Sequence, residues 1–376
     1  MRPRVLVIGA GIAGASAAYQ LSDLCDVTVI EVEGHAGFHS TGRSAAVLST
    51  TSGNSLQCLL AEASRDFFLK PPAGFTDLSL THPRGLLWIA CNESSQNKLD
   101  RIVSRDQLTS RTSRRITRED CGSLILGFRN ESIISGGVLE PDCISIDVAE
   151  FLAGYLRLAK ANSVKLIFDS KFVRALKVKE KSQRWKVVTT KGELFVDAIV
   201  NAAGAWSDEV AALAGIPKIG LQAYKRTACT INLDSNQITW PLVMDVDSQI
   251  YFEPISGGLL VSLSEENPVI AGDAKPDEID IALMLDRLKN TLNYNIGRPT
   301  SAWAGLRTFA TDKLPVVGPD ATDETFFWYS AQGGAGIKTA PALSAILRAT
   351  FFEVELPEIF IENSISKDTF SSSRFN

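Results

Sequence analysis

The sequence predicts an α/β fold in which a Rossmann-like domain is joined to an α+β domain built on an antiparallel sheet. Three stretches of the 376 residues indicate this. Residues 4–8 form a β-branched run that ends at a glycine-rich turn and leads into a helix. A strand, a glycine turn and a helix occur again at residues 326–352. Between them, residues 222–263 alternate apolar and polar side chains, which is typical of an antiparallel sheet with one solvated face.

The remaining elements follow from periodicity and breaker residues. The first part of the chain is predicted to hold a βαβ unit (4–8, 15–24 and 27–31), a polar loop (34–55), a helix (59–68), a strand (85–91) and surface helices (93–121). The rest is predicted to hold a strand (136–142), a helix (147–160) with Asp147 as N-cap, short strands (164–168, 173–178, 185–190, 193–196 and 198–201), a long helix (278–292), a strand (326–330) and a last helix (338–352).

This order predicts two domains, each built from more than one segment of the chain. Two domains are expected because 376 residues exceed what one compact core usually supports. The Rossmann-like domain is expected to comprise residues 1–75, 140–220 and 305–376. The second domain is expected to comprise residues 76–139 and 221–304.

Composition favours a small-molecule partner. Hydrophobic residues make up 45% of the chain and charged residues 22%, which excludes a disordered or collagen-like protein. The net charge is −5 with scattered Lys and Arg, so a nucleic-acid partner is not expected. No apolar run approaches the roughly 20 residues that span a bilayer, so an integral membrane segment is not expected either.

The expected compartment is the cytoplasm. Arg2 and Arg4 before an apolar run imitate a signal peptide, but the glycine spacing inside that run favours a strand, turn and helix. The six cysteines are widely spaced and lack metal-ligand spacing, so free thiols and no metal site are expected.

The first glycine turn predicts a dinucleotide site. Gly9, Gly11 and Gly14 stand at GxGxxG spacing, with Ile12 and Ala13 between them, after a strand and at the start of a helix. Backbone N–H groups and the positive end of the helix would then face a pyrophosphate. Glu31 ends the second strand, where a carboxylate can accept hydrogen bonds from an adenosine ribose. That carboxylate would repel a 2′-phosphate and so disfavours NADP, while NAD and FAD both remain open.

Four ordered stretches carry a family resemblance. They are Phe38-His-Ser-Thr-Gly-Arg-Ser-Ala-Ala46, Asn201-Ala-Ala-Gly-Ala-Trp206, Trp303-Ala-Gly-Leu-Arg307 and Gln332-Gly-Gly-Ala-Gly-Ile337. In order and spacing they resemble the D-amino-acid-oxidase-type FAD oxidoreductases, which include glycine oxidase and sarcosine oxidase. Within that group the first two stretches resemble those of FAD-dependent D-arginine dehydrogenases. The resemblance implies that the dinucleotide is FAD.

The second glycine turn agrees with a flavin, since N–H groups at the start of its helix could face the N1–C2=O edge, where negative charge collects on reduction. Lys338 either adds positive charge there or is simply solvated. Arg43 is expected to offer charge to phosphate or flavin oxygens. The resemblance further implies that Val173 borders the adenine through its backbone. The full set of cofactor residues expected from the two glycine turns and from the resemblance is Gly9, Gly11, Ile12, Ala13, Gly14, Glu31, Ser40, Thr41, Arg43, Ser44, Ala45, Ala46, Val173, Ala203, Gly204, Trp206, Arg307, Gly333, Gly334, Ala335, Gly336, Ile337 and Lys338.

The resemblance also implies a substrate site and a reaction. Arg307 and Tyr251 match the positions that hold a substrate carboxylate in such enzymes, and Arg226 is a third candidate. None of the three histidines falls where a base would reach the α-amine. The expected reaction is hydride transfer from the α-carbon to flavin N5, giving an imine that hydrolyses to a keto acid and ammonia. The reduced flavin would pass its electrons to O2 or to a quinone-type acceptor.

Departures from D-arginine dehydrogenases concern the substrate pocket. Val47 and Ser52 stand where those enzymes carry a histidine and a tyrosine, and Leu86 stands where they place a glutamate. Ala335 replaces a larger residue of the second glycine turn. Because an uncompensated cation is costly to desolvate, D-arginine and D-lysine are not expected as substrates. The alternatives are a cyclic or secondary amine, an NAD-linked dehydrogenase, or a flavin-binding protein without amino acid chemistry.

Overall fold

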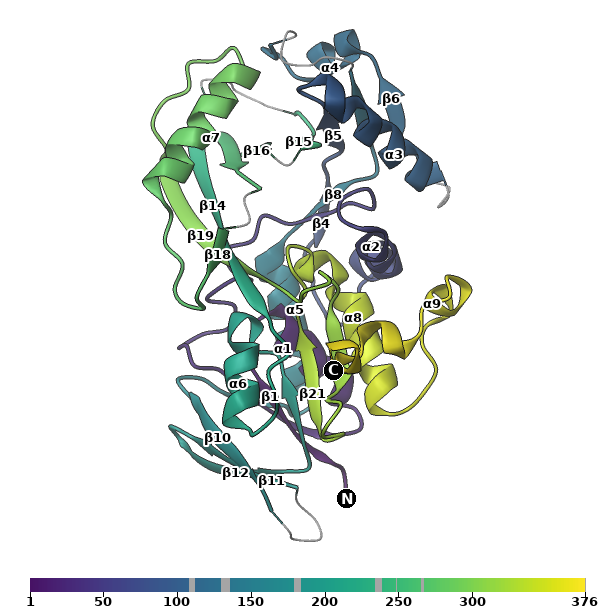
Figure 1. The fold of residues 1–376 in the computed structure, drawn as a ribbon, viewed down its shortest axis with the longest axis vertical. Helices are drawn as coiled ribbons and strands as arrows, with labels where there is room; N and C mark the ends of the chain where they lie inside the picture. Colours follow the sequence, from purple (N-terminus) through teal and green to yellow (C-terminus); the bar gives the residue numbers. More distant parts are fainter. Residues whose placement is uncertain are drawn as a thin grey trace.

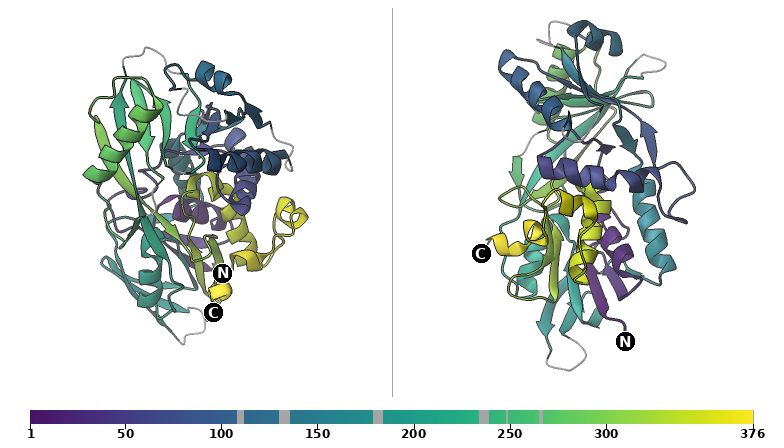
Figure 2. Two further views of the ribbon diagram at one scale, coloured as in Figure 1. Left: turned by 45° about the horizontal axis from the view of Figure 1, so that its top comes forward. Right: turned by 90° about the vertical axis from the view of Figure 1, so that its right-hand side faces the viewer.

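The computed structural model describes residues 1–375 apart from 108–111, 130–135, 179–183, 234–238, 248 and 265–266. The molecule is elongated, with a parallel sheet in one half and a large antiparallel sheet in the other (Figure 1). The parallel half contains both ends of the chain, and two further views show the same division (Figure 2).

A six-stranded sheet forms the centre of the first half. Its strands lie in the order β20 (Val316–Pro319), β21 (Phe326–Ser330), β13 (Ala198–Asn201), β1 (Arg4–Ile8), β2 (Asp26–Ile30) and β9 (Lys165–Ile167). All neighbours are parallel except β20, which is antiparallel to β21. The predicted Rossmann-like fold is confirmed.

Both faces of this sheet are covered, which explains the continuous apolar run of β1. Val5 and Val7 face a core with helices, whereas Leu6 and Ile8 face a second core. The helices of the first core are α1 (Ile12–Leu21), α2 (Ser55–Leu69), α5 (Val148–Ala161), α8 (Gly336–Phe351) and α9 (Glu358–Glu362). The second core is closed by α6 (Ser207–Leu213) and by an antiparallel sheet of β10 (Phe172–Lys177), β11 (Trp185–Thr189) and β12 (Gly192–Val196).

A nine-stranded sheet forms the other half. Its strands are β18 (Asn267–Val269), β14 (Gln222–Asn232), β17 (Gly258–Ser262), β16 (Tyr251–Ile255), β15 (Leu242–Asp245), β5 (Leu86–Ile89), β7 (Gly137–Glu140), β6 (Arg114–Ile116) and β19 (Ser301–Phe309), which pairs with β14. One face packs against α7 (Glu278–Thr291) and α4 (Arg118–Leu124), and α3 (Gln96–Gln107) packs on the opposite face. The expected antiparallel sheet is present, and the expected domain boundary at residue 305 falls inside β19.

A small sheet joins the two halves. It consists of β3 (Val47–Leu48), β8 (Ile144–Ile146) and β4 (Thr81–Pro83), and it includes residues that the sequence assigned to a loop. β6 was also missed, because a three-residue edge strand containing Arg114 and Arg115 shows no alternation that would distinguish it from a polar helix. Residues 108–111 of the predicted helical stretch lie outside the described residues.

Capping residues account for the helix boundaries. Asp147 caps α5 by accepting a hydrogen bond from the Glu150 amide at 2.9 Å, as predicted. α2 begins at Ser55, four residues before the predicted start, because Asn54 and Gln57 form a capping box. In the described part of the chain, no helix is long and apolar enough to cross a membrane.

Gly14 allows α1 to pack directly on the turn that follows β1. A Cβ atom at Gly14 would lie 1.8 Å from the carbonyl oxygen of Gly9, which is backbone and cannot move aside. At Gly11 the nearest atom to such a Cβ would be Thr41 Oγ1 at 3.2 Å.

We therefore expect Gly14→Ala to destabilise the protein by about 1–3 kcal/mol through overpacking, and Gly11→Ala to cost less. Urea unfolding of the two variants, followed by circular dichroism, measures the difference. Equal stability of the two variants would contradict this packing.

Candidate active site

A cavity of about 490 Å³ lies where the strands of the parallel sheet end. The register places Ile8 of β1 beside Ile30 of β2 and Asn201 of β13, and Asn201 beside Trp328 of β21. The turns after these strands therefore meet at one edge of the sheet, the usual position of a ligand in such folds. Both glycine turns line the cavity although they are more than 300 residues apart.

Many of the predicted cofactor residues line this cavity. They are Gly9, Gly11, Ile12, Ala13, Glu31, Ser40, Thr41, Ser44, Ala203, Gly204, Trp206, Arg307, Gly333, Gly334, Gly336 and Ile337. The other predicted cofactor residues, Gly14, Arg43, Ala45, Ala46, Val173, Ala335 and Lys338, lie outside its lining.

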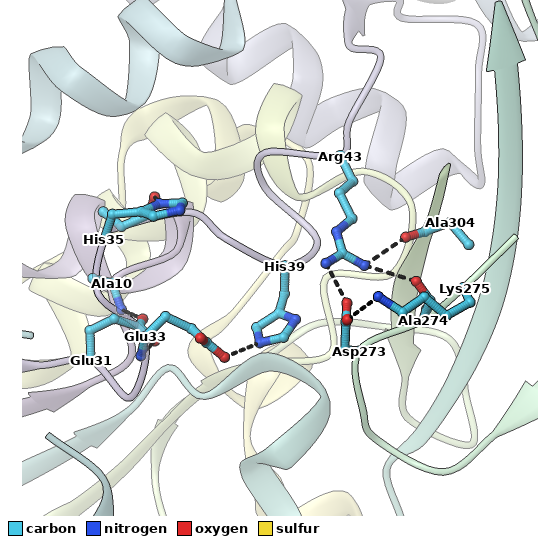
Figure 3. Close-up of polar contacts among 11 residues, drawn as sticks. Ala10, Glu31, Glu33, His35, His39, Arg43, Asp273, Ala274, Lys275 and Ala304 are labelled. Atoms are coloured by element: carbon cyan, nitrogen blue, oxygen red, sulfur yellow. Dashed lines mark hydrogen bonds and ion pairs between the residues drawn. The ribbon is translucent and has the colours of Figure 1, made fainter. Parts of the chain in front are cut away.

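Backbone hydrogen bonds fix the carboxylate of Glu31 at the end of β2. Its Oε2 accepts from the Ala10 amide at 2.7 Å and its Oε1 accepts from the Glu33 amide at 3.0 Å (Figure 3). At the same glycine turn, Thr41 Oγ1 accepts from the Ile12 amide at 3.0 Å and so joins the loop at 38–46 to the start of α1. The adenosine end of a bound dinucleotide could therefore contact a carboxylate that is held in a fixed position beside a glycine turn.

The second glycine turn leaves the start of α8 open to a ligand. The N-cap residue Ala335 makes no side-chain cap, so the first amides of a 16-residue helix have no capping side chain. Gly333 has φ +56°, and a Cβ there would lie 2.3 Å from Phe309 Cε1. The turn therefore requires glycine at position 333. Its backbone amides can face the anionic edge of a ligand.

Arg43 departs from the expectation that it serves phosphate or flavin oxygens. Its Nη2 lies 2.5 Å from Asp273 Oδ1, and its Nη1 donates to the carbonyl oxygens of Ala274 and Ala304 at 3.0 Å each (Figure 3). The guanidinium is drawn to these oxygens because the connection between β18 and α7 passes close to the loop at 38–46.

Lys338 is not solvated, and its ammonium is not directed to the glycine turn. The residue is 8% exposed, and Nζ donates to the carbonyl oxygens of Ser49 at 3.1 Å and Ser52 at 2.7 Å. Val173 points its side chain to solvent, with 40% exposure, and it is the preceding Lys171 and Phe172 that line the cavity.

The predicted substrate residues share one face of the large sheet. Met244 is paired with Tyr251, Tyr251 with Ser262, Ser262 with Ala228, and Ala228 with Trp303. Directly paired residues point to the same side, as do residues two apart. Tyr251, Arg226, Arg307 and Leu86 therefore all lie on this face.

The two arginines meet the second glycine turn. A Cβ at Gly334 would lie 3.5 Å from Arg226 Nη1 and 3.9 Å from Arg307 Cδ. Arg226 Nε is buried and has no hydrogen-bond partner among the described residues. A buried guanidinium nitrogen without an acceptor is costly, so the position suits an anionic ligand.

Two buried acids on this face were missed by the sequence analysis. Glu140 is 2% exposed, and its carboxylate accepts hydrogen bonds from Ser49 Oγ, the Thr50 amide and Thr51 Oγ1. Glu253 is 7% exposed, and burial raises the pKa of its carboxyl, while Arg84 Nε lies 3.6 Å away. Only the strand register shows that these acids are neighbours of Leu86 and Leu242.

His39 was expected to be a loop residue without an acid or base role. Its Nε2 lies 2.9 Å from Glu33 Oε1 (Figure 3). Its ring is 4.6 Å from that of Trp206, centroid to centroid. His39 thus lines the cavity.

The cysteines of the described residues are unpaired and most are buried. The cysteines are free, and burial raises the pKa of Cys25, Cys121 and Cys229 to about 11. The thiols are therefore protonated at neutral pH and weakly nucleophilic. No group of His, Cys, Asp or Glu with the makings of a metal site occurs in the part of the chain that the structure describes.

The cavity suits FAD in three respects. A glycine turn and a fixed acid stand at one end, small and hydroxyl-bearing residues of the loop at 38–46 stand in the middle, and the open start of α8 stands at the other end. Backbone donors are therefore available at both ends of one long cofactor, which an NAD site does not need.

Comparisons with known proteins agree. The chain is 22% identical over 421 residues to D-amino acid dehydrogenase 3 of Mesorhizobium japonicum, a match that covers 94% of this chain and 98% of that protein. It is 28% identical over 277 residues to the mitochondrial pyruvate dehydrogenase phosphatase regulatory subunit of Mus musculus, covering 70% of this chain and 30% of that much longer protein. The solved structure of glycine oxidase from Geobacillus kaustophilus has the same fold, with a TM-score of 0.85, 17% identity and 99% coverage of both chains.

The family expected from the four sequence stretches is confirmed, whereas the likeness to D-arginine dehydrogenases stays an expectation. The model of the family described as FAD dependent oxidoreductase matches residues 4–350, nearly the whole chain. This protein belongs to the DAO family of FAD-dependent oxidoreductases.

Proposed function

We propose that the protein oxidises the C–N bond of an amino acid or a related amine. When bound, FAD supplies the acceptor for the hydride that leaves the α-carbon. The observation that carries the proposal is the meeting of Arg226 and Arg307 at Gly334, in the turn whose amides would face a bound flavin. The names of the relatives, D-amino acid dehydrogenase and glycine oxidase, point to the same class of substrate.

The carboxylate of the substrate is proposed to orient the reacting carbon. Arg307 and Arg226 come from neighbouring strands, and Arg226 Nε has no other acceptor among the described residues. Tyr251 lies on the same face and can donate its hydroxyl hydrogen. Two guanidinium groups and a hydroxyl hold a carboxylate in a fixed orientation, which lowers the entropic part of the barrier.

A histidine base has no place in this reaction. His39 is engaged by Glu33, while His35 and His82 are exposed on the surface. We propose that the amine enters deprotonated, so that no side chain has to remove a proton. The imine product is then hydrolysed by water to a keto acid and ammonia. O2 and a quinone-type compound are both chemically suitable acceptors for the electrons.

The side chain of the substrate is proposed to be neutral. Val47 and Tyr251 pack against the apolar cluster that contains Leu86. The two buried acids of this face are already engaged, Glu140 by the backbone and hydroxyl groups of residues 49–51 and Glu253 by Arg84. Neither offers the carboxylate that a guanidinium or ammonium side chain needs, which disfavours D-arginine and D-lysine.

We predict that neutral amino acids or secondary amines reduce the bound flavin at least about a hundredfold faster than D-arginine or D-lysine, because the cation is left without a counterion. Anaerobic mixing with a panel of D- and L-amino acids, proline and N-methyl amines, followed by flavin absorbance, measures the rates. Faster reduction by the cationic compounds would contradict the neutral pocket. Reduction by dithionite but by no amine would indicate a flavin protein without this chemistry.

We predict that Arg307→Lys raises the KM for a carboxylate-bearing substrate about 10- to 100-fold, since lysine keeps the charge but loses the bidentate contact. Steady-state kinetics on the best substrate of the panel measures the change. Arg174→Lys on the exposed face of β10 is the matched control. The decarboxylated analogue of the substrate should react equally with both variants. An unchanged KM in Arg307→Lys would refute the carboxylate site.

A further inference from the structure

Arg43 joins three segments that are far apart in the sequence. Its side chain binds Asp273 and Ala274, which precede α7, and Ala304 of β19. Its own carbonyl oxygen accepts a hydrogen bond from Trp303 Nε1 at 3.2 Å. The loop at 38–46 belongs to the cofactor cavity, whereas the other two segments belong to the large sheet and its connections. One guanidinium therefore fastens the two halves of the molecule together at the cavity.

The segment at 271–275 is part of the cavity wall but has few other attachments. Asp273 lines the cavity, as do Ser44 and Arg307. No backbone–backbone hydrogen bond holds residues 271–276 within the described part of the chain, and Ile270 just before them is 93% exposed. A segment with so few attachments opens locally at low free-energy cost. The hydrogen bonds from the Arg43 side chain to Asp273 and Ala274 are thus a large share of the interactions that keep this segment in place.

The carboxylate of Asp273 is held in its charged form by two cationic neighbours. Hydrogen bonds first from Lys275 and then from Arg43 lower its pKa to about 2. Lys275 lies in the same segment, at 2.5 Å from Oδ2, so this second ion pair does not cross to the cavity loop. Among the described residues, the bond to Arg43 is the one that connects Asp273 to the loop at 38–46.

We infer that the Arg43–Asp273 pair is a clasp that holds residues 271–275 against the cofactor cavity and slows the release of FAD. Asp273 is a positioning residue in this clasp, because it acts through Arg43. An exposed ion pair contributes little to the stability of the whole fold. Its loss is therefore seen in the opening of the cavity and not in global unfolding. The inference depends on FAD binding and is independent of the proposed substrate.

The test compares the rate constants of FAD release from purified holoenzymes. Asp273→Asn is expected to release FAD about tenfold faster than the wild type, because a charge-assisted hydrogen bond is lost. Arg43→Lys is expected to behave alike, since one ammonium cannot span the three acceptors. After dilution, the fluorescence of the freed flavin reports release, and circular dichroism reports the fold.

Two controls separate the clasp from a general loss of charge. Asp23→Asn removes another partly exposed Arg–Asp pair, with Arg348 at 2.6 Å, that lies outside the lining of the cavity. Lys275→Met removes the second partner of Asp273 but leaves the bond to Arg43. Both variants are expected to release FAD at the wild-type rate.

Salt provides an independent readout. At 1 M NaCl the Debye length falls to about 3 Å, so release from the wild type is expected to accelerate while release from Asp273→Asn changes little. A wild-type release rate in folded Asp273→Asn and Arg43→Lys would overturn the inference. If Asp23→Asn released FAD faster than the wild type by the same factor as Asp273→Asn, the inference would be overturned as well.

Discussion

The parallel alignment of β1 between β2 and β13 is the constraint on which the rest of the site depends. Because these strands run in one direction and in register, Gly9, Glu31 and Ala202 emerge at the same edge of the sheet. β21 adds the second glycine turn to that edge through its pairing with β13. The backbone amides of two distant turns can then serve the two ends of one cofactor, which no single segment could do.

The large sheet adds the chemistry that the parallel sheet lacks. β14 and β19 extend from it toward the cavity and bring Arg226 and Arg307 to Gly334. In this arrangement the parallel half supplies both glycine turns of the cavity, and the large sheet supplies Arg226 and Arg307 of the proposed carboxylate site. Contacts between the halves therefore control both how the cofactor is held and how a substrate is oriented.

The sequence was sufficient to predict the role of a residue where that role depends on local backbone geometry. The spacing of Gly9, Gly11 and Gly14 and the strand before them predicted a turn whose close packing the structure shows at Gly14. It was insufficient to predict the hydrogen-bond partners of a long side chain when those partners are distant in the sequence. Arg43 binds Asp273, 230 residues away, and Lys338 binds Ser49 and Ser52, at separations of 289 and 286 residues. Glu140 and Glu253 were missed because burial beside Leu86 and Leu242 depends on strand register.

A crystal structure of the FAD-loaded protein with a simple carboxylate such as acetate would test the account most directly. We expect the carboxylate to lie beside Gly334, with hydrogen bonds from Arg226 and Arg307 and with the flavin ring next to the second glycine turn. A carboxylate bound elsewhere, with Arg226 Nε still lacking an acceptor, would contradict the proposed site.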